Sequence, residues 1–131
     1  MFRRATCVRI ADVDERPPVW VGHIALAVSD VERSALWWQS LGLREVAREP
    51  QIAIYELRGG THLVLHPDTP TPGDAPFDLM VDNLEATHAA WRDAGLDPST
   101  IERGRIHASF TVRDPDGYAV TVSNSHVAGP V

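Results

Sequence analysis

The chain alternates apolar runs with amphipathic segments in an order that occurs twice. Residues 20–28 are rich in β-forming side chains and predict a strand buried on both faces for most of its length. Ser29-Asp30 then offers an N-cap, and the run to Leu41 continues a helix that Gly42 stops. Three more strands complete a β-α-β-β-β unit, at residues 43–49, 51–57 and 61–66.

A proline-rich linker at residues 67–76 separates this unit from a second one. The second unit repeats the order with a strand at 77–81, a helix at 84–94 and strands near 100–103, 107–113 and 118–123. Two turns are predicted: the glycines of 58–60 favour a hairpin, and the proline and glycine of 114–117 suit the turn between the last two strands.

The two units match at an offset of 53 positions, because 30 falls on 83. The matched pairs are Asp30 with Asn83, Trp38 with Trp91, Gly42 with Gly95, and Leu43 with Leu96. One such unit cannot bury its apolar face alone, so the two must pair with each other or with another chain. We therefore expect an N-terminal arm at 1–18, one domain at 19–124 made of modules 19–68 and 76–124, and a tail at 125–131.

The charge balance of this 131-residue chain limits the classes of partner that it is expected to bind. Acidic residues outnumber basic ones 18 to 12, for a net charge of -6, so nucleic acid and anionic membranes are not expected as partners. All the basic residues are arginines, which excludes a lysine Schiff base. Cys7 stands alone and excludes an intrachain disulfide. The N-terminus lacks an uninterrupted apolar segment and no stretch is long enough to cross a bilayer, so we expect a cytoplasmic protein.

Three features together carry a family likeness: the β-α-β-β-β duplication, the helix end Leu41-Gly42-Leu43, and the strand and turn at 110–118, with its Asp-Pro-Asp-Gly. Over residues 20–124 the chain resembles the vicinal oxygen chelate superfamily, which includes glyoxalase I, extradiol dioxygenases, fosfomycin-resistance enzymes and bleomycin-resistance proteins. The resemblance implies an α+β fold in which two modules form a curled mixed sheet around a ligand cleft. It also implies a homodimer, sometimes with modules exchanged between chains.

Metal-using members of that superfamily take histidine or glutamate ligands from the first and last strands of each module. By this resemblance His23 occupies the first ligand position, but its counterpart at the offset of 53 is Pro76. Thr121 stands where a carboxylate is expected, and the remaining position falls near Val64. No standard metal centre and no cofactor are therefore expected. A rearranged divalent site stays open as the alternative, formed by His23, His66 and Asp78 or by His23, His62 and His66, since His62 and His66 share one face of their strand.

The predicted ligand pocket is mostly apolar with a few polar groups, the usual composition of a small-molecule site. It depends on two register predictions: Tyr55 opposite Val64, and Phe110 opposite Thr121, with each pair facing the cleft. The predicted ligand-binding residues are His23, Tyr55, His66, Phe110, Thr121 and Ser123. No catalytic residue is assigned.

The leading hypothesis is a protein resembling the bleomycin-resistance type, which binds a small organic molecule between its modules. Two alternatives remain. One is a metal-dependent lyase, isomerase or extradiol dioxygenase of the same superfamily. The other is a non-catalytic interaction module whose cleft is filled by its own side chains.

Overall fold

A computed structural model describes residues 13–131 and contains the predicted repeat. The first unit forms a four-stranded sheet in the order β1-β4-β3-β2, with β1 and β4 parallel and the other neighbours antiparallel. A short 3-10 turn, η3 (Arg58–Gly60), joins β3 to β4. The elements of this unit are β1 (His23–Val28), α1 (Val31–Ser40), β2 (Arg44–Glu49), β3 (Ile52–Glu56) and β4 (His62–Pro67).

The second unit builds a matching sheet. Strand β9 lies at its centre, with β8 and then β7 on one side and the short strands β5 and β6 paired to it in parallel on the other. The bounds are β5 (Gly73–Asp74), β6 (Leu79–Val81), α2 (Leu84–Asp93), β7 (Glu102–Arg103), β8 (Ala108–Arg113) and β9 (Tyr118–Asn124). The α+β duplication predicted from the sequence is therefore confirmed.

Local sequence chemistry explains where the helices begin and end. Asp30 is the N-cap of α1, and Asn83, its match in the repeat, is the N-cap of α2. The side chain of each accepts a hydrogen bond from a backbone N–H three residues later, which satisfies one of the open donors of the first turn. After α1 the chain turns at Gly42, whose φ of 102° is a left-handed conformation that suits glycine.

Two strand predictions need correction. The first strand begins at His23, not at residue 20, and is buried on one face only: Leu26 and Val28 are buried, whereas His23 and Ala25 are exposed. The predicted strand at 77–81 is shortened to β6, which starts three residues after Pro76. Cys7 and the rest of residues 1–12 lie outside the described part of the chain.

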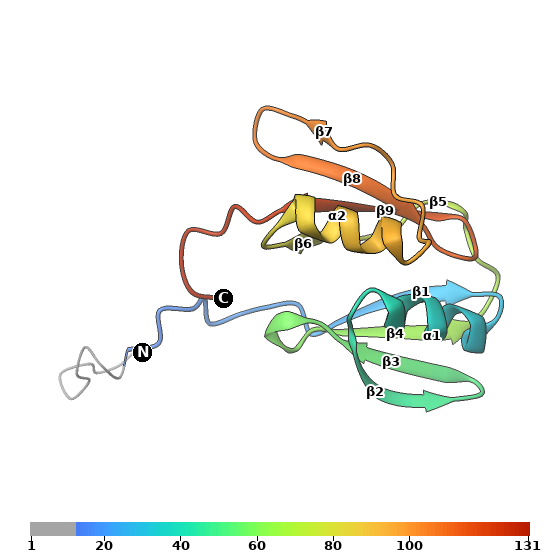
Figure 1. Cartoon of the computed structure of the whole chain (residues 1–131). Helices are drawn as coiled ribbons and strands as arrows, with labels where there is room; N and C mark the ends of the chain where they lie inside the picture. The colour runs from blue at the N-terminus through green and yellow to red at the C-terminus, as the bar shows by residue number, and fades with distance from the viewer. Residues whose placement is uncertain (1–12) are drawn as a thin grey trace.

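The two sheets lie edge toward edge with both helices on the same side (Figure 1). Strands β1 and β6 face one another across the boundary between the halves. Each sheet thus has a face covered by its helix and an opposite face, which we call the open face. Neither helix in this stretch of the chain has the length and apolar character needed to span a bilayer.

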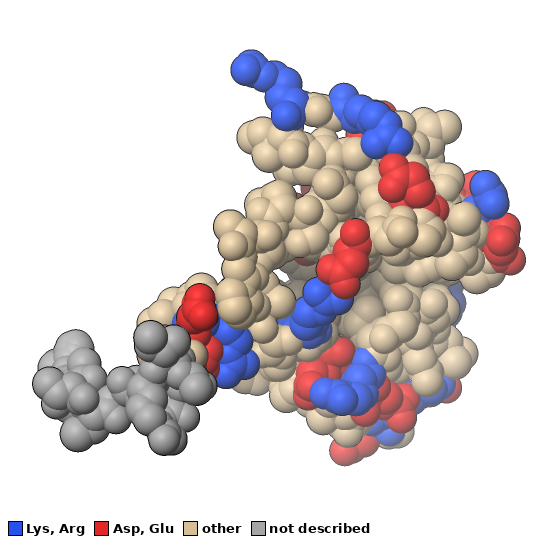
Figure 2. Space-filling model, turned by 60° about the vertical axis from the view of Figure 1, so that its left-hand side comes forward, with Lys and Arg blue, Asp and Glu red and all other residues tan. Residues whose placement is uncertain are grey.

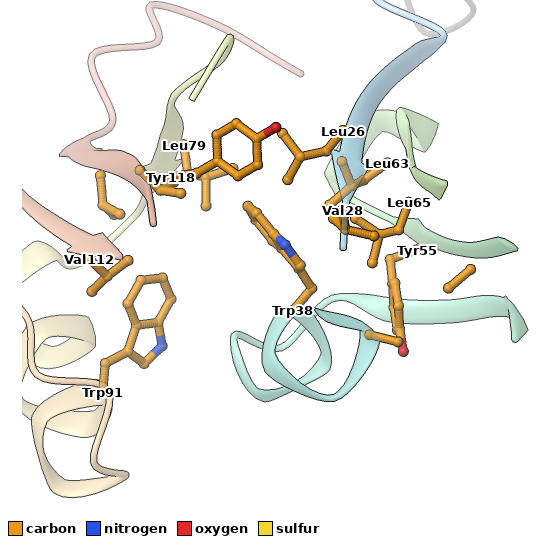
Figure 3. Packing of buried hydrophobic residues seen from close by; sticks show 14 of the residues in the cluster. Leu26, Val28, Trp38, Tyr55, Leu63, Leu65, Leu79, Trp91, Val112 and Tyr118 are labelled. Carbon is orange, nitrogen blue, oxygen red and sulfur yellow. The ribbon is translucent and has the colours of Figure 1, made fainter. Parts of the chain in front are cut away.

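The core lies between the helices and the covered faces and continues across the boundary. Trp38 of α1 is fully buried and its ring lies 5.8 Å from that of Phe77 in the second half. Tyr118 reaches from the second half toward Leu26, above Trp38 (Figure 3). Its hydroxyl donates to the backbone oxygen of Ala27 at 2.9 Å. The halves are therefore held together at the Ala27 end of β1.

Candidate functional site

The open face of the first sheet carries a row of four polar side chains, one from each strand. Backbone register places Arg44 opposite Glu56, Glu56 opposite His62, and His62 opposite His23. Residues directly opposite one another in a sheet point to the same face. This polar row therefore crosses β2, β3, β4 and β1 at the end of the sheet nearest η3.

The members of the polar row contact one another directly. Arg44 forms an ion pair with the Glu56 carboxylate, whose other oxygen lies 3.2 Å from Nε2 of His62. The guanidinium of Arg44, followed by the His62 ring, holds the pKa of the Glu56 carboxyl below its usual value. The His23 ring approaches His62 edge-on, with the ring centroids 5.7 Å apart. Glu56 is thus ionised at neutral pH and orients the imidazole of His62.

A row of aliphatic side chains lies beside the polar row, two residues away on β1, β3 and β4 and three residues away on β2, where a β-bulge intervenes. It consists of Ala25, Val64, Ile54 and Ala47, which are opposite one another in the register. None of the four is fully buried, so the open face presents an accessible apolar surface next to the polar row. We call these four residues the apolar row.

The open face of the second sheet holds a polar hollow of about 560 Å³. Thr121 of β9 and Thr111 of β8 are register partners at its floor. Ser99 lies beside them, and its hydroxyl accepts a hydrogen bond from the backbone N–H of Thr111 at 2.8 Å. Asp74 and Arg113 also line the hollow. Hydroxyl groups and opposite charges at its edge suit a polar ligand group.

A groove of about 820 Å³ separates the halves where β1 and β6 diverge. The side of the molecule on which the chain termini lie is hollowed between its two halves (Figure 2). Val21, Ile24 and Met80 are among its apolar lining residues. An ion pair of 2.7 Å joins Arg58 to Asp82 across this end and lowers the pKa of the Asp82 carboxyl. The two halves are thus linked here by charge, in contrast to the core contacts at the other end.

Both register predictions for the pocket are wrong by one residue. Tyr55 is opposite Leu63, not Val64, and it is fully buried under α1. Phe110 is opposite Val122, not Thr121, and packs edge-on against Trp91 of α2 with the ring centroids 5.7 Å apart. A slip of one residue moves a side chain to the other face of a sheet, so both aromatic residues belong to the core.

The other predicted ligand-binding residues lie on the open faces. His23 and His66 are on the first sheet, and Thr121 is exposed on the second. Ser123 shares the face of Thr121, two residues along β9, but it is buried and its hydroxyl lies 3.5 Å from the Leu79 backbone oxygen.

The predicted alternative metal donors do not converge. His23 is opposite His62, and His66 lies four residues further along β4, about 13 Å away at the usual strand rise. Asp78 directly precedes β6 and lines the groove between the modules. Within residues 13–131, no group of three histidine, cysteine, aspartate or glutamate side chains has a geometry that could hold a metal ion. The standard positions do not fit a metal either, because Val64 and Pro76 lack donor side chains.

Glu56 and Arg44, the residues that organise the polar row, were not among the site residues predicted from the sequence. Glu56 and His62 are six residues apart on either side of the predicted hairpin turn. Two residues at equal distances from a hairpin turn pair across it, so a symmetric turn centred on residue 59 would have joined them. Arg44 had no comparable signal, because a β-bulge between Glu45 and Ala47 shifts its register.

Comparisons with known proteins agree with this architecture. A lactoylglutathione lyase from Agrobacterium tumefaciens has a TM-score of 0.71 at 17% identity, with 88% of this chain and 100% of that chain covered. A glyoxalase/bleomycin resistance protein/dioxygenase from Alicyclobacillus acidocaldarius has a TM-score of 0.66 at 18% identity, covering 86% and 96%. Oxidase ChaP-H2 has a TM-score of 0.65 at 18% identity, covering 86% and 98%. These identities show a common fold alone.

A search of curated proteins finds no match. The sequence profile of the Glyoxalase/Bleomycin resistance protein/Dioxygenase superfamily matches residues 20–122, most of the chain. The match spans both modules, from the strand that carries His23 to the strand that carries Thr121. The chain therefore belongs to the Glyoxalase/Bleomycin resistance protein/Dioxygenase superfamily, the family that the duplicated module and the Asp-Pro-Asp-Gly turn resemble.

Proposed function

We propose that this protein binds a small organic molecule in the cleft between its modules, without the metal centre standard for its superfamily. The observation that carries the proposal is the chemistry of the four inherited ligand positions. Val64 lies in the apolar row, Thr121 is the register partner of Thr111, and Pro76 has no donor side chain. His23 alone retains a good ligand atom, and a single imidazole does not hold a divalent ion.

In this proposal the open faces of the two sheets line the cleft, and they have the composition of a small-molecule site. The first sheet combines its apolar row with a few oriented polar groups, and the second adds a hollow lined with hydroxyls. Pockets of this kind are mainly apolar, with a small number of polar groups that fix the ligand's orientation. The net charge of -6 favours a neutral or cationic ligand over an anionic one. A homodimer and a cytoplasmic location remain predictions from the resemblance and the composition.

The two alternative functions gain less support from the described residues. Two of the similar structures are named as a lyase and an oxidase, but in this chain three of the four inherited ligand positions lack the donor side chains of a metal-dependent enzyme. An interaction module with a filled cleft was expected to use Tyr55 and Phe110 as the filling side chains. Both instead pack in the core beneath the helices.

A binding screen with one blocking variant tests the proposal. We would screen a library of small organic molecules by ligand-observed NMR, in the presence of EDTA. Val64→Trp places an indole over the apolar row and should abolish the binding of the hits. Leu36→Trp is the matched control, because Leu36 is 54% exposed on the outside of α1, and should leave binding unchanged. Hits that need an added divalent ion, or that bind Val64→Trp normally, would refute the proposal.

A restoring variant provides the positive control for metal. Val64→Glu, Pro76→His and Thr121→Glu, combined in one chain with His23, return donor side chains to the inherited positions. We expect this variant to bind Ni²⁺ more tightly than the natural chain in isothermal titration calorimetry. An equal affinity for Ni²⁺ in the natural chain would show that it has a metal site which its sequence and geometry do not predict.

A further inference from the structure

We infer that the first sheet's open face binds a flat, weakly polar molecule that presents one N–H or O–H donor to Nδ1 of His62. The ring of the ligand would lie on the apolar row, and its donor would point toward the polar row. This inference rests on the proposed function and specifies the chemical class of the ligand for that site.

The proton on His62 is fixed by its neighbour. An ionised carboxylate only accepts hydrogen bonds, so the His62 nitrogen that faces Glu56, Nε2, carries the hydrogen. In the neutral form of the ring, which is the form that accepts a hydrogen bond, the lone pair is then on Nδ1. Within residues 13–131, no hydrogen bond reaches that atom. Nδ1 of His62 is therefore an oriented acceptor, and the group that complements it is a donor.

The dimensions of the sheet favour a flat ligand. The apolar row is two residues from the polar row, which is about 6.6 Å at the usual strand rise. Neighbouring strands lie about 4.8 Å apart, so a fused ring pair centred on Val64 covers its partners Ala25 and Ile54. Its edge then reaches His62. The aliphatic side chains of the row offer an apolar surface on which a ring can lie parallel to the sheet.

The charges around the acceptor favour a ligand without a negative charge. The Glu56 carboxylate contacts Nε2 of the His62 ring and keeps its charge because Arg44 is paired with it. A ligand carboxylate at Nδ1 would lack a hydrogen to donate and would face this negative charge. His23, the partner of His62 on β1, approaches the His62 ring edge-on. A neutral ring N–H or hydroxyl meets these constraints.

Two probes that differ only in the donor test the inference. Indole presents a ring N–H, and in 1-methylindole a methyl group replaces that hydrogen. Their affinities would be measured by ¹H–¹⁵N NMR titration of the full chain in EDTA. A hydrogen bond of this kind corresponds to about a tenfold preference, so indole should bind about tenfold more tightly.

Variants locate the preference. His62→Phe keeps a ring but removes the acceptor, so both probes should bind it equally. His126→Phe is the matched control, because His126 is exposed in the second half of the molecule, where its ring stacks on that of His107, and it should keep the tenfold preference. Glu56→Gln should reduce the preference without preventing folding, because an amide can offer His62 either an oxygen or an NH₂ group and no longer fixes its proton.

Each outcome decides the inference. The expected result is a preference for indole that disappears in His62→Phe and persists in His126→Phe. Equal affinities in the natural chain, or a preference that survives His62→Phe, would overturn the inference while small-molecule binding at the cleft still stands. Failure of both probes to bind would also overturn it. The proposed function would then be decided separately by the screen with Val64→Trp.

Discussion

Removing the hydroxyl group of Tyr118 should weaken the connection between the two halves. This hydroxyl donates to the backbone oxygen of Ala27 at 2.9 Å and accepts from the backbone N–H of Thr71 at 3.0 Å. Tyr118→Phe keeps the buried ring, so the packing against Leu26 and Trp38 is preserved and only these two hydrogen bonds are lost. The change thus isolates the polar part of the contact.

The magnitude follows from the surroundings of the two partners. Thr71 is exposed and its N–H can bind water, whereas the Ala27 oxygen is half-buried at the boundary and loses its side-chain partner. Loss of one hydrogen bond with partial desolvation costs about 2 kcal/mol of unfolding free energy. Unfolding entropy near about 2.1 cal/mol/K per residue converts this, for a chain of 131 residues, into a fall of about 7 °C in Tm.

Tyr55→Phe is the matched control. Tyr55 is as deeply buried as Tyr118, but its hydroxyl lies 3.4 Å from the Glu45 carboxylate, beyond the usual O–H to oxygen distance. We expect Tyr55→Phe to cost less than about 0.5 kcal/mol. Urea unfolding followed by tryptophan fluorescence, together with calorimetry, would measure both variants. Equal losses in the two variants would refute the assignment of a specific inter-module contact to the Tyr118 hydroxyl.

Three further predictions concern helix ends and the polar row. Asp30→Ala and Asn83→Ala should each cost about 1 kcal/mol of unfolding free energy in urea, because each removes a helix N-cap; no loss would contradict the capping role. Gly42→Ala should cost about 1 kcal/mol of unfolding free energy, because a residue with a Cβ is strained at its φ of 102°. Gly129→Ala, in equally open space without a positive φ, should leave the unfolding free energy unchanged. The lowered pKa of the Glu56 carboxyl means that its ion pair stabilises the fold at pH values above its ordinary pKa of 4.5. The difference in unfolding free energy between the natural chain and Glu56→Gln should therefore close as the pH falls below 4.5. A difference independent of pH would contradict the ion pairing.

The elements were predictable because each rests on local chemistry. The caps Asp30 and Asn83, the left-handed Gly42, and the Asp-Pro-Asp-Gly turn ending at Gly117 with a φ of 90° all act over a few residues. The offset of 53 positions then gave the duplicated α+β fold. Such signals are read directly from the chain because they do not depend on which strand lies next to which.

The site was less predictable because side-chain direction depends on register. In β3, Ile52, Ala53, Ile54 and Tyr55 are all apolar, so the alternation of polar and apolar residues does not distinguish the two faces. Strand β8 is different, because Phe110 alternates with the polar Ser109 and Thr111. That alternation indicates a core position for Phe110 and was the signal to follow.

The polar row required knowledge of three strand pairings at once. His62 and Glu56 meet across the β3–β4 hairpin, but the approach of His23 depends on the parallel pairing of β1 with β4, which are about 40 positions apart in sequence. Nothing local in the sequence sets that pairing. The same holds for the Tyr118 contact with Ala27, which joins the two modules.

The central claim is that this superfamily fold has kept its cleft while its ligand positions no longer support a metal. Elemental analysis of the protein, purified without an affinity tag and dialysed against a mixture of divalent ions, tests it most directly. We predict substoichiometric amounts of every divalent metal, unchanged in His23→Ala. A tightly held ion at one per chain, lost in His23→Ala, would contradict the claim and indicate a metal-dependent enzyme.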